Sequence, residues 1–251
     1  MTLSLPRMTL GAILAFGISF NAPCAEHHAA KYRVNIPPSA DLSYKIKSRQ
    51  KGFPLEGDGV IRWSTGDRKF SVSNEARAVL IGKILDAHSE GVIDDYGLAP
   101  VSFTEKRFRK SAVTTTFDRA AGVIRFPESD QTLPISGGEQ DRSSAVWQLI
   151  SIARAAQGRF KAGSEWTFTV AGRRDADTWT FKVLKPEKID TPLGKINTLH
   201  ITRVNEPGSG DQQIDIWLAP QQEWYPARIR YSESDGDFIE QTVEKIERKA
   251  S

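Results

Sequence analysis

The chain has 251 residues, of which 39% are hydrophobic and 26% charged, and it contains a single cysteine. This composition excludes an intrinsically disordered chain, a collagen-like repeat and a scaffold held by disulfides. The formal charge of +3 is too small to indicate a nucleic-acid partner, and we expect none.

Residues 1–25 have the features of a secretory signal peptide. Arg7 precedes an uncharged apolar run from Met8 to Phe20, which contains 13 residues. That length suits a signal peptide and falls short of the roughly 20 residues that a membrane-spanning helix needs. No later segment approaches this length, so we expect a periplasmic protein without a transmembrane segment once the signal is removed.

The cleavage position is expected after Cys24 or Ala25. A lipoprotein signal would place an apolar residue three positions before the cysteine and a small residue directly before it. Those positions hold Asn21 and Pro23, so a lipid anchor on Cys24 is the minor alternative. Loss of Cys24 would leave a mature chain that relies on its core instead of on disulfides.

Residues 26–38 are predicted to form a flexible tail that begins near two histidines. Cleavage after Cys24 makes His27 the third residue of the new chain, and cleavage after Ala25 makes His28 the third. An amine, two amide nitrogens and an imidazole in this order can bind Cu(II) or Ni(II) in a square plane. Whether His27 or His28 forms such a site depends on the cleavage position, and an ordinary tail without a metal is the alternative.

Strand-like alternation of apolar and polar residues dominates residues 39–248, which we expect to form a single β-rich domain. Turn residues such as Gly, Asp and Pro separate the strands, as in antiparallel hairpins. The predicted strands are 42–47, 60–64, 70–78, 87–93, 101–108, 112–118, 123–126, 165–171, 178–184, 195–204, 213–218, 227–233 and 238–246.

One segment, residues 141–156, has helical periodicity instead. Val146, Leu149, Ile150 and Ala153 share one face, Asp141 or Ser143 could cap the start, and Gly158 could end the helix. The predicted fold is mainly all-β: an antiparallel β-barrel or a strongly curled sheet, with one helix plugging or covering it. An outer-membrane barrel would also alternate, but its charged strand faces would meet lipid.

Several separated motifs resemble the bacterial domain-of-unknown-function family 3108 over roughly residues 38–247. The resemblance rests on short segments in the same order, namely 44–51, 105–109, 117–118, 140–142, 147–149, 214–220 and 224–231. It implies an exported protein and supplies no activity, cofactor or catalytic residue. The Trp-Leu-Ala-Pro and Pro-x-Arg segments also look like periplasmic lipoprotein carriers with a half-barrel and a helical lid, which is an analogy of shape.

Familiar catalytic signatures are absent from the sequence. It has no G-x-S-x-G elbow, phosphate-binding glycine loop or H-E-x-x-H helix. His88 and His200 fall in predicted strands without a neighbouring ligand, so we interpret both as ordinary wall residues. We therefore expect no cofactor and name no catalytic residue.

The charged run beginning at Glu105 is the best candidate for binding. If the face that carries Phe103 is interior, Glu105 and Arg107 enter the barrel and must pair or meet a ligand. The hypothesis adds Asp141, Arg142 and Trp147 of the helical segment, with Asp215 and Arg228 from later strands. The alternative is a solvated face with structural ion pairs.

These observations favour a non-enzymatic envelope protein that binds an apolar or amphiphilic ligand such as a lipid. A structural or protein-interaction module of the envelope, with a protein partner, is the first alternative. An envelope hydrolase is the second, because carboxylates are plentiful although no spacing selects a pair.

Overall fold

The computed structural model describes residues 29, 31–79, 81–156, 158–206 and 209–249. The predicted signal peptide, with His27 and His28, lies outside the described residues. Within these ranges the structure contains one α-helix and a short 3-10 turn beside a sheet of fifteen strands. The strands are β1 (Ala40–Gln50), β2 (Phe53–Gly66), β3 (Lys69–Ala78), β4 (Gly82–Asp94), β5 (Gly97–Arg107), β6 (Val113–Asp118), β7 (Val123–Arg125), β8 (Thr132–Pro134), β9 (Gln140–Asp141), β10 (Glu165–Ala171), β11 (Ala176–Thr191), β12 (Gly194–Val204), β13 (Gln213–Leu218), β14 (Pro226–Ser232) and β15 (Phe238–Arg248).

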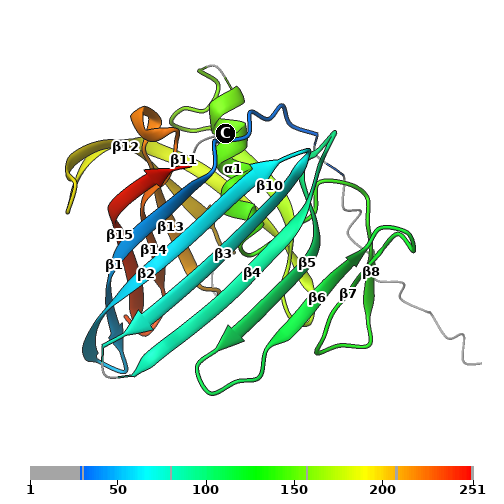
Figure 1. Cartoon of the computed structure of the whole chain (residues 1–251), viewed down its shortest axis with the longest axis horizontal. Coiled ribbons are helices and arrows are strands. Elements are labelled where there is room, and N and C mark those ends of the chain that lie inside the picture. The colour runs from blue at the N-terminus through cyan, green and yellow to red at the C-terminus, as the bar shows by residue number, and fades with distance from the viewer. Residues whose placement is uncertain (1–28, 30, 80, 157, 207–208, 250–251) are drawn as a thin grey trace, which may run out of the picture.

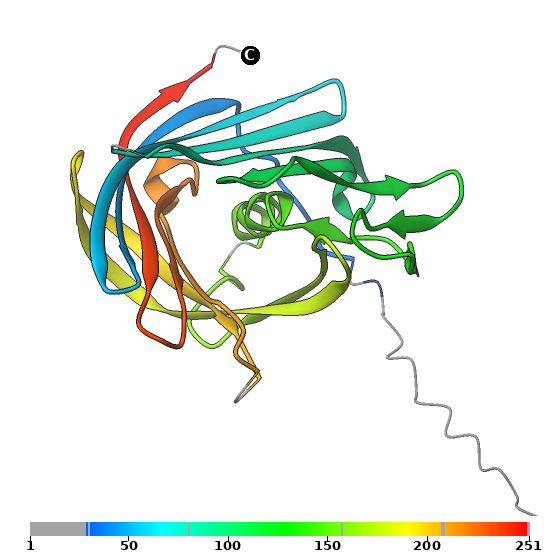
Figure 2. The same ribbon diagram turned by 90° about the horizontal axis from the view of Figure 1, so that it is seen from below.

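Two antiparallel meanders make up the sheet. One runs from β1 to β8 and the other from β15 back to β9, and the pairing of β1 with β15 joins them. Tight turns allow this order because consecutive antiparallel strands need no crossover. The pair β9–β10 is parallel. Strands β8 and β9 are the two edges and do not pair with each other, so the sheet is strongly curled and unclosed (Figures 1 and 2).

Helix α1 (Ser144–Ala155) lies inside the curl, as Figure 2 shows from below. It begins three residues later than predicted because Asp141 belongs to β9. From that position, Oδ1 of Asp141 accepts hydrogen bonds from the amides of Ser143 and Ser144 at 2.8 and 2.9 Å. Ser143 has the N-cap position but makes no side-chain cap bond. Asp141 therefore satisfies the first helical amides, which otherwise lack partners.

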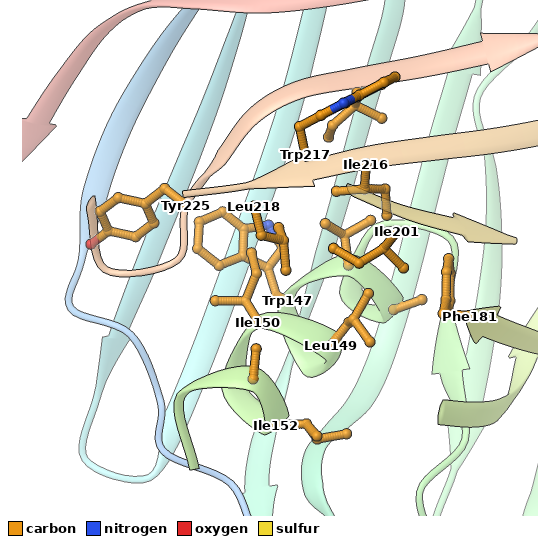
Figure 3. Packing of buried hydrophobic residues seen from close by; sticks show 14 of the residues in the cluster. Trp147, Leu149, Ile150, Ile152, Phe181, Ile201, Ile216, Trp217, Leu218 and Tyr225 are labelled. Atoms are coloured by element: carbon orange, nitrogen blue, oxygen red, sulfur yellow. The ribbon is translucent and has the colours of Figure 1, made fainter. Parts of the chain in front are cut away.

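The core forms where α1 packs against the concave face of the sheet. Figure 3 shows Ile201, Ile216 and Leu218 directed toward the helix, where Leu149 and Ile150 meet them. All five side chains are fully buried. Burying apolar surface of this kind is the main favourable contribution to folding.

One polar side chain of α1 ties the helix to the sheet. Gln148 accepts a hydrogen bond from the amide of Leu98 at 2.9 Å and donates one to the carbonyl of Tyr96 at 2.7 Å. Because Gln148 is almost fully buried, these two bonds remove the cost of burying its amide group.

The segment 31–39 packs across the end of the curl that α1 fills. Tyr32 makes edge-on contact with Trp166, at 5.3 Å between ring centroids. The amide of Asn35 donates to the carbonyl of Ser151 at 2.8 Å, and Trp63 Nε1 donates to the carbonyl of Pro37 at 3.0 Å. We call the end of the curl that α1 and residues 31–39 occupy the helix end.

The opposite end, which we call the open end, carries seven hairpin turns. They join β1 to β2, β3 to β4, β5 to β6, β7 to β8, β10 to β11, β12 to β13 and β14 to β15. Figure 1 shows the first three along the lower edge of the sheet. Since α1 starts at β9 and runs toward the helix end, its first turn faces the open end.

Candidate functional site

The concave face changes in accessibility from one end of the curl to the other. Near α1, inward-facing residues such as Leu42, Trp63 and Val72 are fully buried. Toward the open end, five large inward-facing side chains remain partly accessible. They are Leu55, Leu85, Val113, Tyr231 and Ile239. Because a close-packed core excludes water, this difference means that solvent reaches the concave face at the open end.

Small residues form part of the wall beside these side chains. Along β2, β3 and β4, the inward positions near the open end hold Gly57, Gly59, Ala76, Ala78 and Ala87. The same strands carry large residues at the helix end, where they pack on α1. These small residues are themselves buried, so the accessible apolar surface at the open end is that of the five larger side chains. An apolar lining of this kind is common in ligand sites.

Glu105 and Arg107 lie on the inward face of β5. Phe103 on the same face is buried. This face of β5 is therefore interior, as the hypothesis from the sequence requires. Glu105 is 4% exposed, and its carboxylate forms an ion pair with the guanidinium of half-exposed Arg107. The pair neutralises a carboxylate that would be costly to bury alone.

Arg142 also faces the open end. It directly precedes the first turn of α1, its side chain is exposed, and its guanidinium lies beside Gly172 in the β10–β11 turn. Among the described residues it forms no ion pair and no hydrogen bond. A free guanidinium offers a planar fork of donors that suits carboxylate and phosphate groups.

Three further polar side chains surround Arg142 on the concave face. Burial raises the pKa of Tyr231 to about 12, and the charge of Arg142 opposes that rise. Burial lowers the pKa of Arg203, against the attraction of Asp211, whose carboxylate lies 3.1 Å away. Asp177 has a raised pKa from burial and from the nearby charge of Asp175.

Arg203 has a second role in this wall. Its guanidinium lies over the ring of Trp179 at 4.5 Å. Arg203 is therefore held by an ion pair and an aromatic ring, whereas Arg142 lies near Asp177 and Tyr231 without forming an ion pair or a hydrogen bond to any described residue. The geometry leaves Arg142 as a cation beside an accessible apolar surface.

Two predicted site residues lie in the core instead. Asp141 is fully buried, and Ser89 Oγ donates to its Oδ2 at 2.5 Å. Burial raises the pKa of Asp141, although its hydrogen bonds oppose the rise. Trp147 stacks on Trp63. Both residues hold the helix in the curl and present no accessible group to a ligand.

Asp215 and Arg228 lie on the opposite, convex face. In β13, Ile214 and Ile216 point inward, so alternation directs Asp215 outward. Asp215 is 2.9 Å from Nε2 of His200, whose ring stacks on Trp217 at 4.3 Å. The expected internal network that joined these residues to Arg142 is therefore not formed.

The β11–β12 hairpin covers this convex cluster. Trp217 Nε1 donates to Oε2 of Glu187 at 3.0 Å, and Arg228 Nη2 donates to the carbonyl of Asp190 at 3.0 Å. Nδ1 of His200 lies 3.6 Å from the same Glu187 oxygen. His200 is thus held between two carboxylates and links the hairpin to β13, while His88 lies on the exposed surface beside Glu90.

Metal centres and hollows are two other kinds of site that the rest of the described surface could contain. In the described part of the chain, no group of three or more His, Cys, Asp or Glu is arranged to hold a metal. Two hollows of about 520 and 560 Å³ lie near the β2–β3 turn and beside residues 31–35. Both are at the helix end, away from Arg142.

The sequence profile of a family described as "Protein of unknown function (DUF3108)" matches residues 41–244. The chain belongs to the DUF3108 family. This confirms the resemblance found in the sequence, and the matched region runs from β1 into β15. Among curated proteins, none matches the chain significantly.

Three solved structures are similar to this DUF3108 protein at low identity. A provisionally assigned lipoprotein of Parabacteroides distasonis has 10% identity and a TM-score of 0.34, with 88% of this chain and 100% of that one covered. A DUF1329 family protein of Desulfovibrio piger has 8% identity and a TM-score of 0.31, with 86% and 87% covered. The Mycobacterium tuberculosis lipoprotein LppX has 11% identity and a TM-score of 0.25, with 84% and 88% covered. At such scores, these likenesses carry no argument about function.

The structure adds concave-face residues of this DUF3108 protein that the sequence did not single out. Tyr231, Arg203 and Asp177 come near Arg142 because β10 to β14 pair in chain order and curl around the start of α1. In each strand, the alternation of side chains places the polar residue on the same face as the buried apolar residues. This alternation could have predicted from the sequence that the three residues face inward. Within the described residues, no helix combines the length and the apolarity of a bilayer span.

Proposed function

We propose that this protein is an exported, non-enzymatic binder of an amphiphilic ligand in the cell envelope. The apolar part of the ligand would lie on the concave face at the open end, and its anionic group would meet Arg142. The signal-like residues 1–25 support a periplasmic location for the mature protein.

The accessibility of inward-facing apolar side chains carries this proposal. Leu55, Leu85 and Ile239 would all be buried if the open end were filled as the helix end is. Ligand sites combine such an apolar lining with a small number of polar groups that set orientation. Arg142 and the Glu105–Arg107 pair supply those groups at the same end of the curl.

Mass spectrometry of the protein purified from the periplasm tests the location and the ligand together. We expect a chain that begins at Ala25 or Glu26 and carries a co-purified amphiphile. A folded protein that retains no amphiphile and binds no fluorescent fatty-acid probe would contradict the binding function and favour a structural or interaction module.

A substitution that fills the open end tests the location of the site. Ala78→Phe would place a ring on the inward face of β3, so we expect probe binding to fall by about tenfold or more. The matched control is Ala120→Phe in an exposed turn, which should bind normally. Circular dichroism establishes that both variants fold. Equal probe affinity in the two variants would place the ligand elsewhere.

A further inference from the structure

Three neighbouring hairpin turns at the open end expose large apolar side chains. Phe53, the first residue of β2 after the β1–β2 turn, is 72% exposed, Val79 in the β3–β4 turn is 59% exposed, and Phe108 in the β5–β6 turn is 43% exposed. Ile81 is also exposed. Folding normally buries such side chains, and an exposed group of them marks an interaction site.

The same three turns concentrate positive charge. Residues 49–56, 77–83 and 106–111 contain eight Lys and Arg but only one acid, Glu56. The net charge of these three segments is +7, whereas the net charge of the whole chain is +3. Among the described residues, six of these cations form no ion pair: Arg49, Lys51, Arg77, Lys106, Arg109 and Lys110. We call these three turns the basic rim.

Sheet geometry places the turns of the basic rim in one row. Strands β1 to β6 are consecutive neighbours in the sheet, so the three turns follow one another along its edge (Figure 1). Paired strands lie about 4.8 Å apart, so successive turns are roughly 10 Å apart. The row is therefore long enough to meet a flat partner at three points.

The other four turns at the open end have the opposite charge. Residues 126–131, 173–175, 205–212 and 233–237 contain eight acids and two basic residues. Only the basic rim combines exposed aromatic and aliphatic tips with unpaired cations. The asymmetry indicates a partner with a negatively charged surface that also accepts apolar side chains.

We propose that the basic rim docks this protein on the surface of a lipid bilayer that contains anionic lipids. Phe53, Val79, Ile81 and Phe108 would enter the headgroup region, and the surrounding Lys and Arg would meet anionic headgroups. This inference goes beyond ligand binding on the concave face and does not depend on it. Docking in this orientation would turn the open end of the curl toward the membrane.

Vesicle sedimentation with the protein as the host cell processes it tests the proposal. Vesicles of phosphatidylcholine alone are compared with vesicles that contain phosphatidylglycerol as well. We expect binding only to the anionic vesicles, and weaker binding as salt rises, because salt screens exposed charges. Equal binding to both vesicle types, or to neither, would overturn the proposal.

Matched variants locate the docking surface. Phe53→Ser with Phe108→Ser should lower the partition coefficient about tenfold, whereas Leu193→Ser, at 48% exposure near the helix end, should leave it unchanged. Lys51→Glu with Lys110→Glu should lower it by at least about fivefold per charge. The control pair is Lys185→Glu with Lys188→Glu on the β11–β12 hairpin.

Two readouts separate docking from its alternatives. The fatty-acid probe should bind the Phe53 and Phe108 variant normally, so loss of docking and loss of ligand binding are distinguishable. Light scattering reports whether the rim instead joins two copies of the chain. A dimer that the Phe53 and Phe108 substitutions convert to a monomer, without vesicle binding by the parent protein, would overturn the proposal in favour of self-association.

Discussion

The indole ring of Trp147 in α1 lies flat on that of Trp63 in β2, with 4.3 Å between ring centroids and 6° between planes. Both side chains are almost fully buried. Tyr225 meets the edge of the Trp147 ring at 6.0 Å. This stack joins the helix to the wall of the curl and fills the concave face at the helix end, whereas at the open end inward-facing side chains remain partly accessible.

Trp147→Ala should lower the free energy of unfolding by about 3–5 kcal/mol, because it leaves a large cavity between helix and sheet. Chemical denaturation measures this loss. Trp147→Phe should cost less, since a ring still covers Trp63. A double-mutant cycle of Trp147→Phe and Trp63→Phe should give a coupling of about 0.5–1.5 kcal/mol. A loss below about 1 kcal/mol for Trp147→Ala would contradict the plug role of the helix.

Asp141→Asn should change how stability depends on pH. Burial raises the pKa of Asp141 above its ordinary value of 3.8, so the folded state holds this proton more tightly than the unfolded state. The wild type therefore loses stability from this group as the pH rises above 3.8. The asparagine variant does not ionise at this position and should escape that loss.

Thermal unfolding between pH 4 and pH 7 measures the effect. The Tm of Asp141→Asn minus that of the wild type should increase with pH. Asp130→Asn on the exposed surface is the control, and its difference from the wild type should stay constant. A difference for Asp141→Asn that falls with pH would show that hydrogen bonds to the carboxylate outweigh its burial.

Gly97→Ala should destabilise the protein more than Gly194→Ala. Both glycines have positive φ, at 104° and 97°, so both substitutions strain the backbone similarly. A Cβ on Gly97 would lie 2.4 Å from Oε1 of Gln148, whereas a Cβ on Gly194 would meet open space. We expect an additional loss of about 1–3 kcal/mol at Gly97 from the disturbed Gln148 hydrogen bonds.

Combining Gly97→Ala with Gln148→Ala isolates that contact. The double variant should lose less stability than the sum of the two single variants, because removing the amide relieves the clash. Additive losses in denaturant unfolding would place the cost of Gly97→Ala in the backbone alone.

Arg142→Ala should weaken binding of an anionic amphiphile by about tenfold or more and leave an uncharged analogue of the same chain length unaffected. Arg142 has no protein partner among the described residues, so its removal should change the free energy of unfolding by less than about 0.5 kcal/mol. Arg159→Ala, at an exposed position beyond the helix, is the control. Equal losses of affinity for charged and uncharged ligands would contradict a headgroup role.

Much of the fold follows from local pattern. The strands predicted at 165–171 and 213–218 coincide with β10 and β13, because apolar residues alternate there without interruption. The helix was predicted at 141–156 and spans Ser144–Ala155, since Asp141 is held in β9 while it caps the first turn. Strands β8 and β9 are missing from the predicted set because they contain one apolar core residue at most, Leu133 in β8, whereas the equally short β7 carries Val123 and Ile124.

The candidate site could be predicted only in part. Alternation correctly put Glu105 and Arg107 on the face of Phe103, but it could not determine which face of β13 is inward. Both faces of that strand carry large apolar residues, because the β11–β12 hairpin covers Trp217 on the convex side. Asp215 and Arg228 were therefore assigned to an internal network that the structure does not contain.

Thirteen of the fifteen strands, the helix and the family could be predicted from the 251 residues, since periodicity and motifs are local properties. The unclosed sheet, the position of α1 at one end and the proximity of Arg142 to Tyr231 at the other became visible only in the folded chain. Folding also brought Phe53, Val79 and Phe108 into one row. The pairing of β1 with β15, the curl of the sheet and the packing of α1 inside it create these relationships, because they bring together residues that no local pattern connects.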